Sequence, residues 1–260
     1  MKNLYLILFL SLLSHCVSAQ NDSTNFNLLE AAYDNDQSAL IKALKDSADV
    51  NFKDYDGNTA LIYASQKGNI DIVKILLYNG ADPKEKNTNG FTPLHEAAKF
   101  SHNLICNELL MSGADVEAQA SFFEIKAIHF AAAYNNLELV DMLLFYKADV
   151  NAVTKYGVTA LHLASHAGYY PIDSILLANG ADINIRDEDK NTALILATQN
   201  NQIHIVRYLI DSGALIDVQN KDNNNAIYFA LDQKNIDIID TLVYAYQKRN
   251  IQASNANELA

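Results

Sequence analysis

The residues best able to do chemistry here are histidines close to a carboxylate or to each other. His95-Glu96 begins like the His-Glu-x-x-His pair of zinc peptidases, but Lys99 stands where the second histidine should be and cannot ligate zinc. His162 and His166 are four residues apart, so they could share one helix face, but no third ligand is evident. A metal-binding or small-ligand-binding site at His162, His166 and neighbouring carboxylates is therefore an alternative, not the main prediction.

Other catalytic patterns are missing from the sequence. We find no glycine-rich phosphate loop, no nucleophile elbow and no carboxylate pair in a plausible cleft. We therefore predict that the protein is not an enzyme and needs no cofactor. Cys106 lies 33 residues after Val73, at the same position of a sequence pattern that recurs along the chain. It is therefore expected to be a small buried hydrophobe, not a reactive thiol.

The histidines belong to a repeat that organises the whole chain. One apolar position recurs at intervals of 33 or 34 residues, at Leu61, Leu94, Ile128, Leu161, Leu194 and Ile227. Around the second of these the chain reads Gly90-Phe91-Thr92-Pro93-Leu94-His95-Glu96-Ala97-Ala98, and Gly113-Ala114-Asp115 follows nineteen residues after Leu94. This period and the Thr-Pro-Leu-His-x-Ala-Ala pattern resemble the ankyrin repeat.

The resemblance implies an all-α ankyrin-repeat solenoid of helix-turn-helix units with short β-hairpin or turn fingers. Each helix pair is too small to bury its own apolar side, so stacked units share one core. We predict about seven units including caps: an N-terminal cap at 25–53, repeats at 54–86, 87–119, 120–153, 154–186 and 187–219, and a C-terminal cap at 220–252. Residues 253–260 are expected to be a tail.

Capping and turn residues fix the expected helix ends. Gly57 supplies the positive φ of a tight turn, and Thr59 is expected to cap the following helix through its hydroxyl. Gly68 ends that helix, and Gly80 ends the next one in the left-handed conformation.

The first nineteen residues predict export. Lys2 precedes an apolar run from Leu4 to Leu13, and Val17-Ser18-Ala19 is a small-residue cleavage site, so 1–19 reads as a signal peptide and 20–24 as a disordered tail. We expect a periplasmic or secreted protein, and lipid attachment at Cys16 is less favoured because His15 precedes it. No second apolar run is long enough for a membrane span.

The net charge limits which classes of partner are expected. With 31 acidic and 19 basic residues the net charge is −12, which disfavours nucleic acid and suits either a basic partner or simple solubility. We predict a monomer that binds a partner protein through the concave face, with a secreted effector acting in a host cell as a further alternative. By the family resemblance, contacts come from the turn tips and the exposed ends of the first helices. The predicted contact residues are Tyr55, Asp56, Phe91, Lys99, Phe100, Phe122, Phe123, Tyr134, Tyr156, His166, Glu188 and Asp189.

The third repeat departs from the pattern. It gains one residue before Ile128, loses the turn glycine and capping threonine, and places Phe122 and Phe123 at the finger tip. Local rules are broken mainly at functional or strained places. Two interpretations remain open: these rings are binding anchors, or they fill a gap between adjacent fingers.

Overall fold

The computed structural model describes residues 23–120 and 122–258, which contain helices joined by turns and no β-strand. This confirms the all-α class, and in the described part the fingers are turns. The chain divides into two compact units, residues 1–121 and 122–260, at a point inside the predicted third repeat. None of the described helices is long and apolar enough to cross a membrane. The predicted leader, with Cys16, lies outside the described residues.

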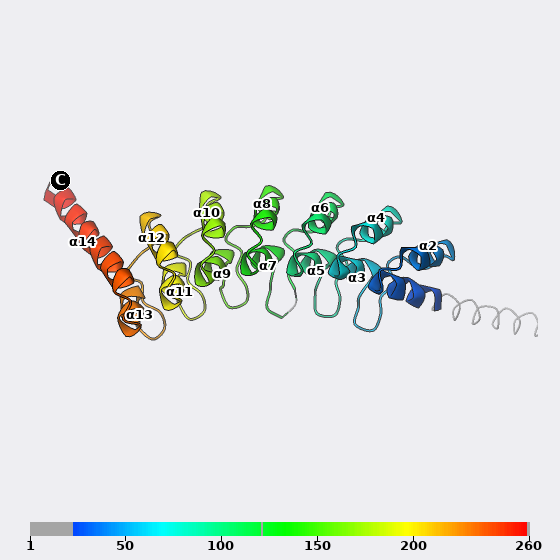
Figure 1. Ribbon diagram of the computed structural model, residues 1–260, viewed down its shortest axis with the longest axis horizontal. Helices are drawn as coiled ribbons and strands as arrows, with labels where there is room; N and C mark the ends of the chain where they lie inside the picture. The colour runs from blue at the N-terminus through cyan, green and yellow to red at the C-terminus, as the bar shows by residue number, and fades with distance from the viewer. Residues whose placement is uncertain (1–22, 121, 259–260) are drawn as a thin grey trace, which may run out of the picture. The chain divides into compact units, whose positions relative to one another are not determined.

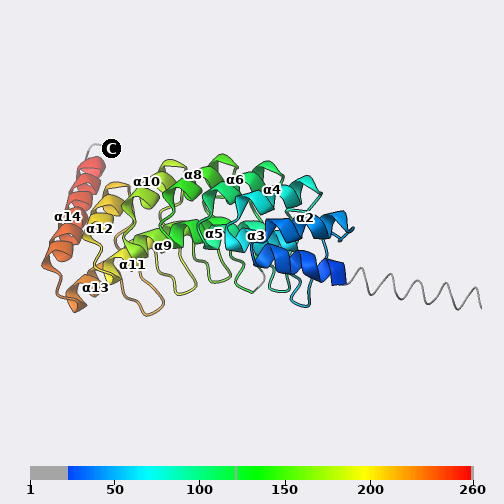
Figure 2. The same cartoon turned by 45° about the vertical axis from the view of Figure 1, so that its right-hand side comes forward.

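The first unit consists of helix pairs in two layers. α3 packs against α4 and α5, and α5 packs against α6. Within this unit α3 and α5 lie in one layer, α2, α4 and α6 lie in the other, and the finger loops project beyond the α3–α5 layer (Figures 1 and 2). The helices are one over 23–33, α2 (Gln37–Lys45), α3 (Ala60–Lys67), α4 (Ile70–Tyr78), α5 (Pro93–Lys99) and α6 (Asn103–Met111).

The second unit repeats this arrangement. α9 packs between α7 and α11, α11 also packs against α13, and each of these inner helices contacts the outer helix that follows it. Its helices are α7 (Ala127–Ala133), α8 (Leu137–Phe145), α9 (Ala160–Ala167), α10 (Tyr170–Ala178), α11 (Ala193–Gln199), α12 (Ile203–Asp211), α13 (Ala226–Asp232) and α14 (Ile236–Glu258).

The helix ends follow the predicted local signals. The hydroxyl of Thr59 accepts the backbone N–H of Ile62 at 3.3 Å, which caps α3. Gly68 ends α3 with φ of 82°, and Gly80 follows α4 with φ of 89°. A side chain at this position of a helix end would be strained, so glycine fixes where the helix stops.

The repeated apolar position forms the core of each unit. Leu61 and Leu94 in the first unit, and Ile128, Leu161 and Leu194 in the second, are at most 2% exposed. Burying one such side chain contributes about 2 kcal/mol. The sixth occurrence, Ile227 on α13, is only partly buried, so the five earlier helix pairs carry the fully buried anchor.

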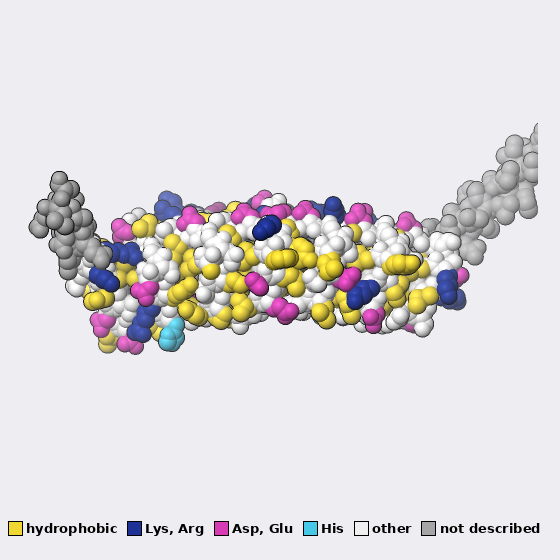
Figure 3. Space-filling view, turned by 90° about the horizontal axis from the view of Figure 1, so that it is seen from above, with side chains coloured by type: hydrophobic (Ala, Val, Ile, Leu, Met, Phe, Trp, Pro, Cys, Tyr) yellow, Lys and Arg dark blue, Asp and Glu magenta, His cyan; other side chains and the backbone are white. Residues whose placement is uncertain are grey.

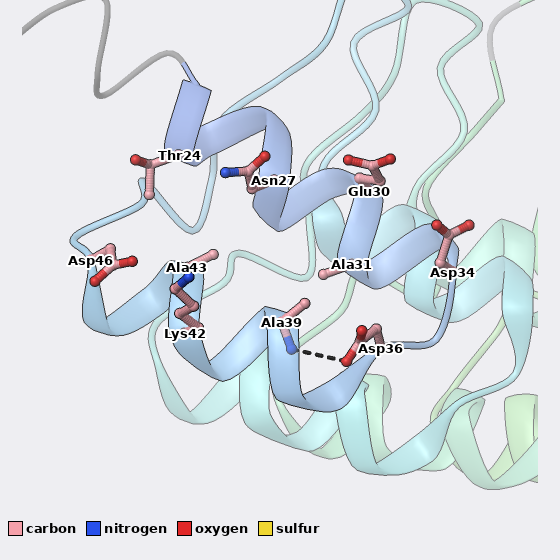
Figure 4. Close-up of a pocket in the computed structure, with 10 residues that line it drawn as sticks. All are labelled: Thr24, Asn27, Glu30, Ala31, Asp34, Asp36, Ala39, Lys42, Ala43 and Asp46. Atoms are coloured by element: carbon pink, nitrogen blue, oxygen red, sulfur yellow. Dashed lines mark hydrogen bonds between the residues drawn. The ribbon is translucent and has the colours of Figure 1, made fainter.

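The outer face of the first helix pair is polar (Figure 4). Glu30 on helix 23–33, Asp34 in the turn after it and Lys42 on α2 line a shallow depression of about 310 Å³, and Asp36 accepts the N–H of Ala39 at 2.9 Å. A terminal repeat needs such a face, because no further repeat covers it.

Both predicted tails need correction. Ser23 and Thr24 belong to the first described helix, so the predicted disorder of 20–24 is wrong for these two residues. α14 continues to Glu258, so residues 253–258 are helical. No glycine or proline follows Ile236, and nothing in the sequence therefore stops this helix before the end of the described chain.

Candidate functional site

The histidines of the repeat are buried and join each finger to its helix. The Nδ1 atom of His162 accepts the backbone N–H of Thr159 at 3.1 Å, so the ring proton lies on Nε2, which donates to the carbonyl of Asn191 at 3.2 Å. His129 makes the equivalent pair of bonds, with Lys126 and Ala152. Burial lowers the pKa of both rings, so both are neutral at pH 7. Their role is structural.

The described residues around His162 and His166 do not form a set of metal ligands. His162 faces inward with both ring nitrogens engaged, whereas His166 is exposed and its Nδ1 lies 2.8 Å from the amide nitrogen of Asn200. Among residues 23–120 and 122–258, no group of three His, Cys, Asp or Glu side chains could hold a metal ion. Cys106 is buried on α6, and burial raises its pKa to about 12, so it remains a thiol as predicted for a core residue.

The irregular finger of the third repeat keeps the backbone geometry of a regular one. Glu124 adopts φ of 54° at the position where three other repeats have the turn glycines Gly57, Gly90 and Gly157. The N–H of Lys155 donates to the carbonyl of Phe123 at 2.9 Å, and the next finger repeats this bond from Glu188 to Tyr156 at 2.8 Å. The unusual sequence therefore changes which side chains the finger displays, and not how it joins its neighbour.

The two phenylalanines at this finger tip have different surroundings. Phe123 packs against Tyr156 with ring centroids 5.9 Å apart and is 45% exposed. Phe122 lies edge-on to Phe123 at 5.0 Å, with the Lys155 ammonium 4.3 Å from its ring centre, and is 64% exposed. The gap-filling interpretation therefore describes Phe123 in part, while Phe122 remains mostly open.

An apolar groove of about 270 Å³ runs between this finger, the next finger and the helices α7 and α9. We call it the apolar groove. Its lining is almost wholly carbon, and the only ionisable side chains in it are the buried His129 and the tyrosines. The lining residues are Phe123, Ile125, His129, Phe130, Ala133, Tyr134, Thr154, Tyr156, Val158 and Leu163.

Tyrosine rings at the mouth of the apolar groove remain accessible. Tyr134 is 53% exposed and Tyr156 is 42% exposed. Tyr134 stacks on Phe130 with an interplanar angle of 3° and a centroid distance of 6.3 Å, which holds the tyrosine in place. Rigid, half-open aromatic rings around an apolar depression are typical of binding hot spots.

The predicted contact residues include Phe123, Tyr134 and Tyr156 of this lining and miss the others, of which Phe130 and Leu163 are the largest on the helices. Both occupy the second position after the repeated apolar residue, at Ile128 and Leu161. Phe130 is one helical turn before Tyr134, so the spacing of four residues was a signal for their contact.

Two acidic residues among the predicted contacts lie together at one exposed finger tip. Glu188 and Asp189 are exposed, and Asp189 forms an ion pair with Lys221 at 3.3 Å, which reduces the charge it presents. On the face shown in Figure 3, acidic and basic side chains are interspersed and form no continuous basic stripe.

The remaining predicted contact residues belong to the first unit. Tyr55 is 94% exposed at its finger tip, and the adjacent Asp56 accepts the N–H of Thr88 through its carbonyl. Phe91 is half-buried, whereas Phe100 is more open, and the Lys99 ammonium lies 5.7 Å and 5.3 Å from their ring centres. Phe91, Lys99 and Phe100 therefore form one cluster in the first unit, while Tyr55 lies 6.5 Å from the ring of Phe26.

Comparison with known proteins matches this chain to proteins that contain ankyrin repeats. A family model for ankyrin repeats in three copies matches residues 28–120, 119–187 and 174–255. SH3 and multiple ankyrin repeat domains protein 2 of Homo sapiens is 35% identical over 128 residues, which are 49% of this chain and 7% of that protein. Inversin of Canis lupus familiaris is 36% identical over 114 residues, 43% of this chain and 10% of inversin.

A third relative is an enzyme. The liver isoform of mitochondrial glutaminase of Rattus norvegicus is 42% identical over 82 residues, which are 31% of this chain and 14% of that protein. The chain therefore spans only a small part of the length of these relatives.

Proposed function

Because the chain belongs to the ankyrin-repeat family, we propose that it is a protein-binding module whose apolar groove takes an apolar segment of a partner protein. The observation that carries this proposal is the accessible aromatic lining between the fingers at 122–126 and 154–158 and the helices α7 and α9. Repeats of this family are interaction modules, and a catalytic role has no support from the site described above.

The size and chemistry of the groove define its occupant. About 270 Å³ accommodates one or two leucine-sized or phenylalanine-sized side chains, and the near-absence of polar groups disfavours a charged one. Burying each such side chain would contribute about 1.5–3 kcal/mol. The ammonium of Lys155 lies over Phe122, beside the groove residue Phe123.

Removal of the two half-exposed tyrosines tests the groove. Tyr134→Ala with Tyr156→Ala should weaken partner capture at least tenfold, because each truncation removes about 1–2 kcal/mol of contact with the partner. The matched control is Phe145→Ala on α8, which truncates a 76% exposed aromatic outside the groove lining of the same unit.

The experiment compares the three tagged proteins as baits for exported proteins of the producing cells, with bound proteins measured by quantitative mass spectrometry. Far-UV circular dichroism first establishes that all three are folded. A partner retained by the wild type and by Phe145→Ala, and lost from the tyrosine variant, supports the proposal. Equal capture by all three baits would reject the groove as the binding site.

We also propose that the protein acts outside the cytoplasm. The support is the leader pattern at 1–19, with cleavage expected before Gln20. Cell fractionation with N-terminal sequencing would check this and would separate periplasm from medium. An uncleaved chain in the cytoplasmic fraction would contradict it.

A further inference from the structure

The first unit has a second depression whose chemistry differs from that of the apolar groove. It lies between helix 23–33, the finger that begins at Asp54, and α3, and its volume is about 450 Å³. We call it the N-terminal pocket. Its lining residues are Phe26, Leu29, Glu30, Tyr33, Asp54 and Tyr63.

Aromatic rings form the walls of the N-terminal pocket and leave faces open. Phe26 is 43% exposed and Tyr33 is 48% exposed. Tyr33 is held edge-on against Tyr63 at 5.5 Å, and Phe26 is held against Phe52 at 5.2 Å. The ammonium of Lys67 lies 3.5 Å from the ring centre of Tyr33 and occupies one face of this ring, which shows that the ring attracts a cation but leaves only its other face and Phe26 for a ligand.

A fixed carboxylate lies beside these rings. One oxygen of Asp54 accepts the N–H groups of Asp56 at 2.9 Å and Asn58 at 2.8 Å, and the other accepts the hydroxyl of Tyr63 at 2.5 Å. Burial and the bond to Asp54 raise the pKa of Tyr63 to about 12, so the phenol keeps its proton and donates it in the hydrogen bond to Asp54. Glu30 adds an exposed carboxylate to the same lining.

Five of the six lining positions recur three repeats later in the lining of the apolar groove, where none of them is a carboxylate. These positions differ by 100 in residue number, so Glu30 corresponds to Phe130, Asp54 to Thr154 and Tyr63 to Leu163. The repeat therefore builds one kind of depression twice, with carboxylates in the first unit and hydrocarbon in the second. Asp54 is already bonded to Asp56, Asn58 and Tyr63, but an apolar occupant would still displace water from the exposed Glu30 carboxylate without offering it a partner.

We propose that the N-terminal pocket binds the side chain of an arginine in a partner polypeptide. A guanidinium is planar, stacks on tyrosine and phenylalanine rings, and donates to a carboxylate from the same plane, whereas its aliphatic stem suits Leu29. The net charge of −12 favours the approach of a basic segment. This site shares no residue with the apolar groove, so either proposal can fail without the other.

An NMR titration tests the proposal on the isotope-labelled protein purified from its producing cells. The probe is Nα-acetyl-arginine amide, and the control is Nα-acetyl-citrulline amide, which has nearly the same shape and no charge. The arginine probe is expected to shift resonances of Leu29, Tyr33 and Tyr63, with at least threefold tighter binding than citrulline. Equal shifts with both probes, or none with either, would overturn the proposal.

Two matched variants separate a local site from general attraction to an acidic protein. Glu30→Gln should weaken binding of the arginine probe at least threefold. Glu188→Gln removes one exposed carboxylate from the other unit and should leave the affinity unchanged. Equal weakening by both variants, or no weakening by Glu30→Gln, would assign the shifts to non-specific charge and overturn the site.

Discussion

Replacing the buried aspartate of α10 should stabilise the protein, and should do so more at pH 8 than at pH 4. Asp173 is fully buried, and its Oδ1 accepts the hydroxyl of Ser165 at 3.1 Å. Its Oδ2 has no hydrogen-bond partner among the described protein groups. Burial raises the pKa of this carboxyl from 3.8 to about 7, because the ionised form loses its hydration.

The sign and size of the effect follow from this pKa difference. Below pH 3.8 the carboxyl is protonated in both the folded and unfolded chains, so ionisation costs no stability. Between pH 3.8 and about 7 the unfolded chain releases the proton while the folded chain keeps it, and the free energy of unfolding falls. Above pH 7 the loss is constant at about 4 kcal/mol.

The third repeat supplies the matched replacement. Ala132 and Val140 occupy the positions of Ser165 and Asp173, and both are fully buried. The double variant Ser165→Ala with Asp173→Val should therefore fit without a cavity and without an unpaired hydroxyl. Its free energy of unfolding should exceed that of the wild type by about 4 kcal/mol more at pH 8 than at pH 4.

Urea unfolding followed by far-UV circular dichroism at pH 4, 5, 6, 7 and 8 measures this difference. Subtracting the free energy of unfolding of the wild type from that of the variant at each pH cancels the titration of every other carboxylate and histidine. Asp173→Asn is the control that removes the charge and keeps a polar group. The free energy of unfolding of this variant, relative to that of the wild type, should rise over the same pH range. A difference that stays constant from pH 4 to pH 8 would refute the reasoning.

Further substitutions test other parts of the fold. Gly57→Ala should lower the free energy of unfolding by about 1–3 kcal/mol, because φ is 76° and a Cβ would lie 2.9 Å from the N atom of Thr88. Gly80 has φ of 89° and open space around the position of a Cβ, so Gly80→Ala should lower the free energy of unfolding by less in the same urea assay. His162→Ala should lose about 2–3 kcal/mol at pH 8 by removing two buried hydrogen bonds. That loss should be smaller at pH 5. The pKa of the ring is lowered in the folded protein, so below pH 6.5 the unfolded chain binds a proton that the folded protein does not bind. This difference already lowers the free energy of unfolding of the wild type, and the variant does not have it. Cys106, with its raised pKa, should react with a thiol reagent in a colorimetric assay only after the protein is unfolded.

The repeat period and the helix ends were predictable from the sequence because their causes are local. Thr59 bonds to a backbone group three residues away, and Gly68 needs only its own left-handed conformation. The leucine and isoleucine positions identified the core because they recur once per helix pair. The two tails were predicted incorrectly because polar composition alone does not end a helix when glycine and proline are missing.

The depressions were harder to predict because their walls come from different repeats. Leu163 reaches the apolar groove only because its finger pairs with the finger of Phe123, a relation that helical spacing does not show. The same holds for Phe26 and Tyr33, which face the finger of Asp54 in the N-terminal pocket. Asp173 was not anticipated either, since its position is filled by Val140 and Val206 in neighbouring repeats.

Hydrogen exchange with and without the captured partner tests the central claim most directly. If the apolar groove is the binding site, amides of residues 122–134 and 154–163 should exchange more slowly in the complex, and those of α8 and α10 should be unchanged. Protection confined to α8 and α10, with the groove segments exchanging as in the free protein, would contradict the proposed function.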